Sequence, residues 1–236
     1  RILDLPEASA LSVEALTQIR DTALSALEEN DPNYYWTLNN FGARLLEKSR
    51  SGDIPYTHPL YDELLNGWCS GVAQRDRLDL TAQISLIRSI NNTANLLINH
   101  KQFANAEALC RLLVPFKSCR KKTARNQAII YERSIIFYSA YHQNDDSLIE
   151  LGERVIEECI RRKALQSVAS ITVWLIVSYL CNKRTLPFDR LIKDNALLTR
   201  IASRQKLFLE RCVDMTLLNL SEEQYGSVSE SILIEC

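Results

Sequence analysis

Glycine and proline are scarce in this sequence, with six of each among 236 residues. Folds made of many short strands need frequent tight turns rich in these two residues, so their scarcity disfavours an all-β sandwich. The sequence also has no CxxC pair, HExxH motif, EF-hand spacing or Gly-rich phosphate loop. We therefore expect no metal, no cofactor and no catalytic site, and hence a non-enzymatic protein.

Neither a strong charge nor a long apolar run is present. The 28 basic and 29 acidic residues give a net charge of −1, so the whole chain does not attract nucleic acid. The longest nearly apolar run, 168–181, is shorter than the roughly 20 residues of a membrane-spanning helix. We expect this run to form a buried core helix, and we expect no membrane association.

The seven cysteines are an odd number and are widely spaced, which does not suggest a disulfide framework. They predict a reduced, cytoplasmic protein. Because the sequence begins at Arg1 rather than Met, we expect a domain or a processed fragment of a longer chain.

The sequence is 46% hydrophobic and 24% charged, which is enough apolar residues to form a sizeable core. Three helices are expected in the N-terminal region, 1–75, because each starts at a capping residue or a proline (Ser12, Asp31 with Pro32, and Pro59). The expected helices cover 13–29, 32 to about 50, and 59 to about 72. The first two are expected to pair as a hairpin.

From Leu80 onward the expected helices repeat in pairs. Long helices are predicted at about 80–100, 122–142 and 164–182, each followed by a shorter one at about 104–115, 147–163 and 187–203. The long helices thus recur with a period of about 42 residues, and His100 and His142 have the same separation. A repeat of this length that contains two helices predicts a solenoid, in which each hairpin buries its apolar face against its neighbours. We expect one helical-repeat domain over 1–236, made of N-terminal helices (1–75), three hairpin repeats (80–203) and capping helices (204–236).

The pair of helices between Ile90 and Pro115 has small residues, Ala94 and Ala106, where the helices would cross, and Phe103 at the turn. This order resembles a tetratricopeptide unit. The resemblance implies an all-α fold of stacked antiparallel hairpins, a tetratricopeptide-like α-solenoid whose first helices line a concave groove. The chain resembles more weakly the sensing domain of Rgg- and PlcR-type regulators, without their DNA-binding helix-turn-helix.

Four polar residues, Arg88, Asn91, Asn95 and Asn99, share one face of the 80–100 helix because they recur every three or four residues. Asparagine is a poor helix former, but its carboxamide can both donate to and accept from the main chain of an extended peptide. The resemblance implies that this face lines the groove. Carrying the face forward by 42 residues adds the candidates Arg133, Phe137 and Tyr141, and a second step of 42 adds Tyr179. The alternative is that the asparagines only solvate an exposed face.

Two basic clusters lie between the predicted hairpins, separated by about one repeat. They are Arg120, Lys121 and Lys122, and Arg161, Arg162 and Lys163. In a solenoid such clusters form one basic edge, which could meet an acidic partner. The alternative is that the cations only complement the negative ends of helices. No aromatic residues alternate with them, so the sequence does not favour nucleic-acid binding by this domain alone.

Histidine and cysteine chemistry is the remaining catalytic option. His100 and His142 are explained as polar residues at helix ends, and His58 is expected in a loop. Cys110 could pair with His100 as a nucleophile, but its place on an apolar stripe favours an inert core thiol.

Two functions stay open from the sequence. The preferred one is a peptide- or protein-binding helical-repeat domain, including the sensing part of a larger regulator. The alternative is a structural scaffold of a multiprotein complex; an enzyme is a third and weaker reading. Self-association into a homo-oligomer is compatible with either function.

Overall fold

The computed structural model describes Leu3 and residues 6–143, 145 and 147–162, and these contain helices and no strands. This confirms the all-α class for the described part of the chain. The chain divides into two compact units, residues 1–143 and 144–236. The α-helices of the first unit are α1 (Val13–Ser25), α2 (Pro32–Ser51), α3 (Pro59–Ala73), α4 (Leu80–Asn99), α5 (Phe103–Arg111) and α6 (Lys122–His142). The described helix of the second unit is α7 (Leu148–Arg161).

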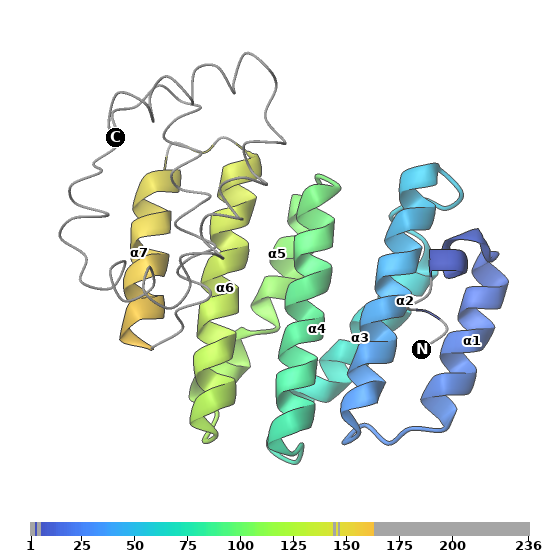
Figure 1. Ribbon diagram of the computed structural model, residues 1–236, viewed down its shortest axis with the longest axis horizontal. Helices are drawn as coiled ribbons and strands as arrows, with labels where there is room; N and C mark the ends of the chain where they lie inside the picture. Colours follow the sequence, from blue (N-terminus) through green and yellow to red (C-terminus); the bar gives the residue numbers. More distant parts are fainter. Residues whose placement is uncertain (1–2, 4–5, 144, 146, 163–236) are drawn as a thin grey trace. The chain divides into compact units, whose positions relative to one another are not determined.

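Helices α2, α4 and α6 form one layer of the first unit, with α4 packed between the other two. Figure 1 shows them side by side, with α3 and α5 behind them. One continuous core runs from Leu3 through α2 and α4 to Ile135 of α6. The N-terminal helices therefore share their core with α4 and α6, and α2 packs on both α1 and α4.

The capping signals set the starts of α2 and α3. The carboxylate of Asp31 accepts from the amide of Asn33, and Pro32 occupies the first turn, as the sequence predicts. His58 was expected in a loop, but it is the N-cap of α3, where Nδ1 accepts from the amide of Leu60. The histidine supplies an acceptor to an otherwise free helix amide.

Helix α1 ends at Ser25, so the prediction that it continues to about residue 29 was wrong. Glu29 and Asn30, which follow the observed end of the helix, instead form hydrogen bonds with other elements. The Glu29 carboxylate accepts from Ser70 of α3 and from Gln74, the C-cap of that helix. The Asn30 carboxamide accepts from the amide of Asp79 at the start of α4. These tertiary bonds outweigh the local preference for helix.

Helices α2 and α3 approach closely at Gly71, which has no side chain to keep them apart. A Cβ atom there would lie 2.7 Å from the ring and the hydroxyl of Tyr35. Nearby, the buried indole of Trp68 donates to the Ser89 hydroxyl at 2.8 Å, which joins α3 to α4. Close backbone packing and a buried hydrogen bond thus fix α3 against both α2 and α4.

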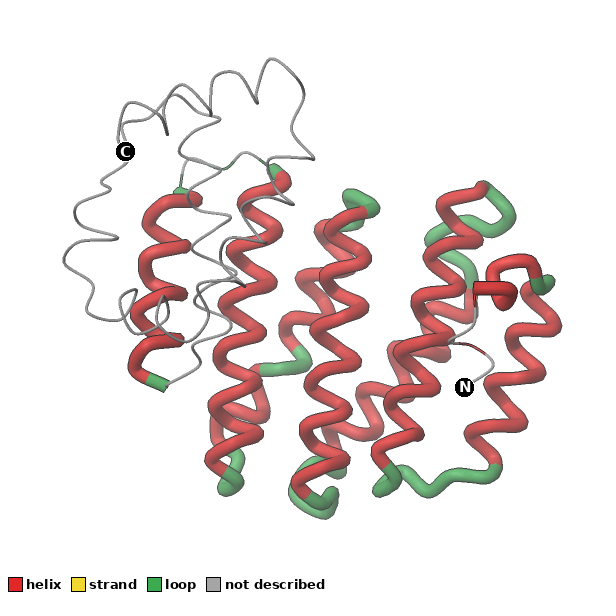
Figure 2. Tube along the Cα trace, in the orientation of Figure 1, coloured by secondary structure: helices red, strands yellow, loops and turns green. Residues whose placement is uncertain are grey.

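A tight turn reverses the chain between α4 and α5, and Figure 2 shows this short loop. The amide of Lys101 bonds to the carbonyl of Ile98, and the amide of Gln102 bonds to that of Leu97. These two bonds form a Schellman motif. Lys101 has φ of 59°, the left-handed conformation that usually selects glycine at this position. The hairpin predicted around residues 90–115 is therefore present, with Ala94 and Ala106 both buried.

Helix α5 was predicted to reach about residue 115, but it ends at Arg111 and a 3-10 helix follows over Val114–Ser118. Pro115 explains this, because it lacks an amide hydrogen and disfavours α-helix at the preceding residue. Helices α4 and α6 start at Leu80 and Lys122, where the sequence predicts the first two long helices. The third predicted hairpin lies outside the described residues, so the solenoid and its period stay predictions.

A buried glutamine joins three segments at one end of α4. Gln83 is fully buried, and its amide nitrogen donates to the carbonyls of Arg75 and Leu78 between α3 and α4. Its oxygen accepts from the thiol of Cys119, and Lys121 donates to the same Leu78 carbonyl. The two connections on either side of the α4–α5 hairpin therefore meet at one side chain.

Candidate peptide-binding site

The four polar residues predicted on α4 lie on one accessible stripe. Arg88 and Asn99 are exposed, and Asn91 and Asn95 are half-buried. Most of the residues between them, including Ile90, Ala94 and Ile98, are buried, whereas Asn92 and Leu96 are half-buried. The spacing of three or four residues thus puts the four side chains along a single line, beside the neighbouring helices α2 and α6.

Two carboxamide oxygens on α2 and α4 lack hydrogen bonds. Within the described part of the chain, the buried Oδ1 atoms of Asn39 and Asn95 have no hydrogen-bond partner. Asn39 is only 9% exposed, and its Nδ2 donates to Asn40 at 2.8 Å. A buried acceptor without a donor costs about 1–3 kcal/mol, so this part of the molecule retains unused capacity to accept hydrogen bonds.

The candidates on α6 divide into accessible and buried side chains. Arg133 and Tyr141 are half-buried, but Phe137 is fully buried and packs its ring 5.5 Å from that of Tyr138. The expectation that Phe137 faces an open groove was therefore wrong, since a large apolar side chain gains more in the core. Tyr179 lies outside the described residues.

The two basic clusters occupy different structural positions. Lys121 is the N-cap of α6 and Lys122 its first residue, so the interpretation that these cations complement a negative helix end was wrong. Lys121 instead donates to the Leu78 carbonyl, while Arg120 and Lys122 are exposed. The first cluster thus has one structural lysine and two accessible cations.

In the second cluster, Arg161 and Arg162 both donate to the carboxylate of Glu158. Burial alone would raise the pKa of Glu158, but the hydrogen bonds and charges of the two arginines outweigh it and lower this pKa. These arginines stabilise the end of α7, in keeping with the local interpretation. Lys163 lies outside the described residues.

The catalytic option gains no support from the contacts of His100 and Cys110. Nδ1 of His100 lies 2.9 Å from the hydroxyl of Tyr56, and the Cys110 thiol contacts the Glu132 carbonyl. Burial, with a smaller contribution from Glu132, raises the pKa of the Cys110 thiol to about 12. A thiol with this pKa is almost entirely protonated near neutral pH and is a poor nucleophile.

Two kinds of feature are absent from the described residues. None of their helices has the length and apolar character needed to cross a lipid bilayer. They also contain no group of three or more His, Cys, Asp or Glu side chains arranged to hold a metal ion.

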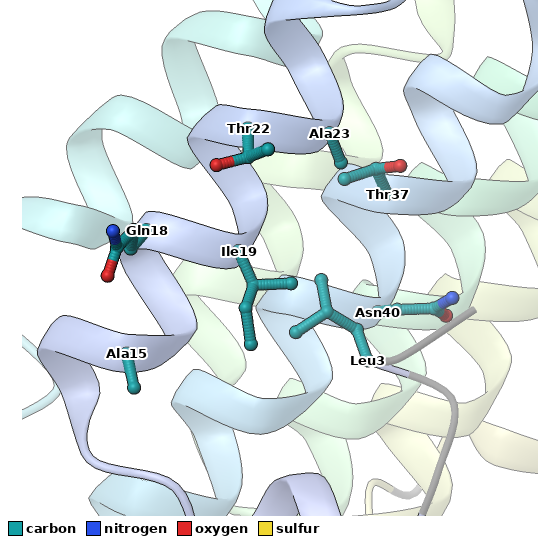
Figure 3. Close-up of a pocket in the computed structure, with 8 residues that line it drawn as sticks. All are labelled: Leu3, Ala15, Gln18, Ile19, Thr22, Ala23, Thr37 and Asn40. Atoms are coloured by element: carbon teal, nitrogen blue, oxygen red, sulfur yellow. The ribbon is translucent and has the colours of Figure 1, made fainter.

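Several pockets in the first unit were not predicted, and two of them have mainly apolar linings. One, of about 520 Å³, lies between α1 and α2, and Figure 3 shows Ile19, Leu3 and Asn40 among its lining residues. Its described lining has no titratable side chain, so it offers no acid or base. The other, of about 350 Å³, lies between α3, α5 and the end of α4. Both depend on gaps between packed helices, which no local pattern reveals.

The described part of the chain is therefore all-helical, with a polar stripe on the central helix of one layer. Comparison with protein-family models, curated proteins and solved structures found no match to the chain.

Proposed function

We propose that the chain is a non-enzymatic binding domain that holds an extended peptide or protein segment along α4. The observation that carries this proposal is the accessible stripe of Arg88, Asn91, Asn95 and Asn99, in which the Oδ1 atom of Asn95 has no partner among the described residues. Asn91 and Asn95 lie in the interior of α4, where asparagine lowers helix propensity. A binding role accounts for their presence better than solvation alone.

The chemistry of the stripe suits a peptide backbone. Each carboxamide offers both a donor and an acceptor, as does each peptide group, so the contacts do not depend on the peptide's side chains. The guanidinium of Arg88 can add a bidentate contact to a carboxylate, which favours acidic peptides or a free C-terminus. Arg133 of α6, which is half-buried, can act in the same way.

The packing of α4 between α2 and α6 also supports the proposal, since neighbouring helices provide side walls for a peptide. The resemblance to tetratricopeptide hairpins agrees, because first helices line the groove in that family. The alternative is a scaffold that joins subunits through its edge, and exposed Arg120 and Lys122 favour this possibility.

A peptide library displayed on phage provides the test. We expect the full chain to enrich peptides whose affinity falls by about 1–3 kcal/mol in Asn95→Ala, because the substitution leaves a peptide group unpaired. Asn91→Ala should behave similarly. Asn66→Ala is the matched control, because Asn66 is exposed on α3.

Equal loss in the Asn66 control, or no enrichment at all, would refute the α4 site. Binding that survives the α4 substitutions but is lost in Arg120→Glu with Lys122→Glu would support the scaffold instead.

A further inference from the structure

The pocket between α3 and α5 has the features of a small-molecule site, separate from the polar stripe of α4. Its volume of about 350 Å³ lies within the usual range for ligand pockets, about 300–1,000 Å³. Its inner wall consists of buried apolar side chains, which are Leu64 and Trp68 of α3, Leu97 of α4 and Leu109 of α5. Such a wall favours an apolar ring.

This inner wall is held in place before any ligand binds. The Trp68 indole is anchored by its hydrogen bond to Ser89. A Cβ on Gly42 of α2 would lie 2.9 Å from Leu64 and 3.7 Å from the hydroxyl of Thr93, so α2 closes the space directly behind the wall. A preformed pocket loses little entropy on binding.

One buried polar group in the pocket is unused. Thr93 is 3% exposed, and its Oγ1 atom has no hydrogen-bond partner in the part of the chain that the structure describes. Its side chain lines the pocket. The hydroxyl itself lies against α2, 3.7 Å from a Cβ atom placed on Gly42, and it is not accessible, so the ring site stays apolar at this point.

The mouth of the pocket selects for positive charge. Asp62 and His58 line it, and Nδ1 of His58 accepts from the amide of Leu60. No lysine or arginine is among the described lining residues. The rings of Tyr56 and Tyr61 stand 6.5 Å apart at the same pocket, and the Tyr61 hydroxyl is fixed by Ser49 at 2.8 Å. A carboxylate and aromatic faces together favour a cation and disfavour an anion.

From these features we propose that the pocket binds a small aromatic amine. Its ring would lie against Leu97 and Leu109. Its ammonium group would lie at the mouth near Asp62 and the tyrosines. This site would be independent of peptide binding along α4.

Two probes with the same ring and opposite charge test the proposal, namely tryptamine and indole-3-acetate. Binding to the full chain is measured by calorimetry. We expect tryptamine to bind at least about tenfold more tightly than indole-3-acetate, because the charge at the mouth favours the cation. Asp62→Asn should reduce this preference.

Ala108→Trp fills the pocket from its exposed rim, and we expect it to weaken tryptamine binding at least about tenfold by occluding the ring site. Ala104→Trp is the matched control, since Ala104 is exposed on α5 and does not line this pocket. Circular dichroism establishes that both variants stay folded.

Three results would overturn the proposal. They are no tryptamine binding at millimolar concentration, equal affinity for the two probes, and equal weakening by the two tryptophan variants. The first would exclude an aromatic amine as the occupant of the pocket. None of them bears on the peptide-library experiment, because none of the residues substituted there lines this pocket.

Discussion

The hydroxyl of Tyr56 lies 2.9 Å from Nδ1 of His100, although the two residues are 44 apart in sequence. Their rings also meet edge to face, with centroids 6.1 Å apart. The contact joins the loop before α3 to the residue that ends α4. The predicted end of the α4 helix is therefore also a tertiary contact.

The protonation of His100 should affect stability. Burial, followed by the nearby charge of Arg50, lowers the pKa of His100 below its ordinary value. The unfolded chain therefore takes up a proton at a higher pH than the folded chain, so stability is full above the unfolded pKa and is lost as pH falls toward the folded one. We expect urea unfolding to show a larger loss of stability on acidification from about pH 7.5 to 5.5 in the wild type than in His100→Gln. An equal loss in both proteins would contradict this role.

The left-handed turn at Lys101 should be improvable. A non-glycine residue in this conformation lowers the stability of the folded state by about 1–2 kcal/mol. Glycine removes this strain, but its greater conformational entropy in the unfolded chain offsets part of the gain in stability. We therefore expect Lys101→Gly to raise the free energy of unfolding by about 0.5–1 kcal/mol. Lys101→Ala keeps the strain and should leave the stability nearly unchanged. If alanine stabilises as much as glycine, the gain does not come from the turn.

The packing of α5 on α4 should be sensitive to volume at Ala106, which is 1% exposed. We expect Ala106→Leu to lower the free energy of unfolding by about 1–3 kcal/mol through overpacking. Ala104→Leu, on the exposed side of the same helix, should change it by less than about 0.5 kcal/mol. Chemical denaturation measures both variants. Unchanged stability in Ala106→Leu would show that the pairing of the helices is wrong.

The buried bond from Trp68 to Ser89 should behave as a coupled pair. Ser89→Ala leaves the indole hydrogen unpaired and should cost about 1–3 kcal/mol. In a Trp68→Phe background the same serine substitution should cost clearly less, because no donor is left unpaired. A double-mutant cycle of unfolding free energies measures the difference. Equal costs in the two backgrounds would show that the bond contributes nothing.

Local signals were sufficient to predict several elements. Asp31 and Pro32 identified the start of α2, and Pro59 identified that of α3, because caps and prolines act through the adjacent backbone. The end of α1 was not predictable in this way, since it depends on bonds from Glu29 and Asn30 to distant helices.

The candidate site likewise has some features that local patterns predict and others that they do not. The common face of Arg88 and Asn95 follows from helical periodicity and is present in the structure. The burial of Phe137 depends on its tertiary packing, and the pocket at Thr93 depends on the distance between α3 and α5. Neither quantity is encoded in a local pattern.

The position of Gln83 has a consequence for how the first unit comes apart. Its carboxamide bonds both to the connection before α4 and to Cys119 in the connection before α6. Opening either connection therefore breaks bonds that hold the other. The helices on the two sides are expected to unfold in one cooperative step, whereas a stack without such a link could fray one hairpin at a time.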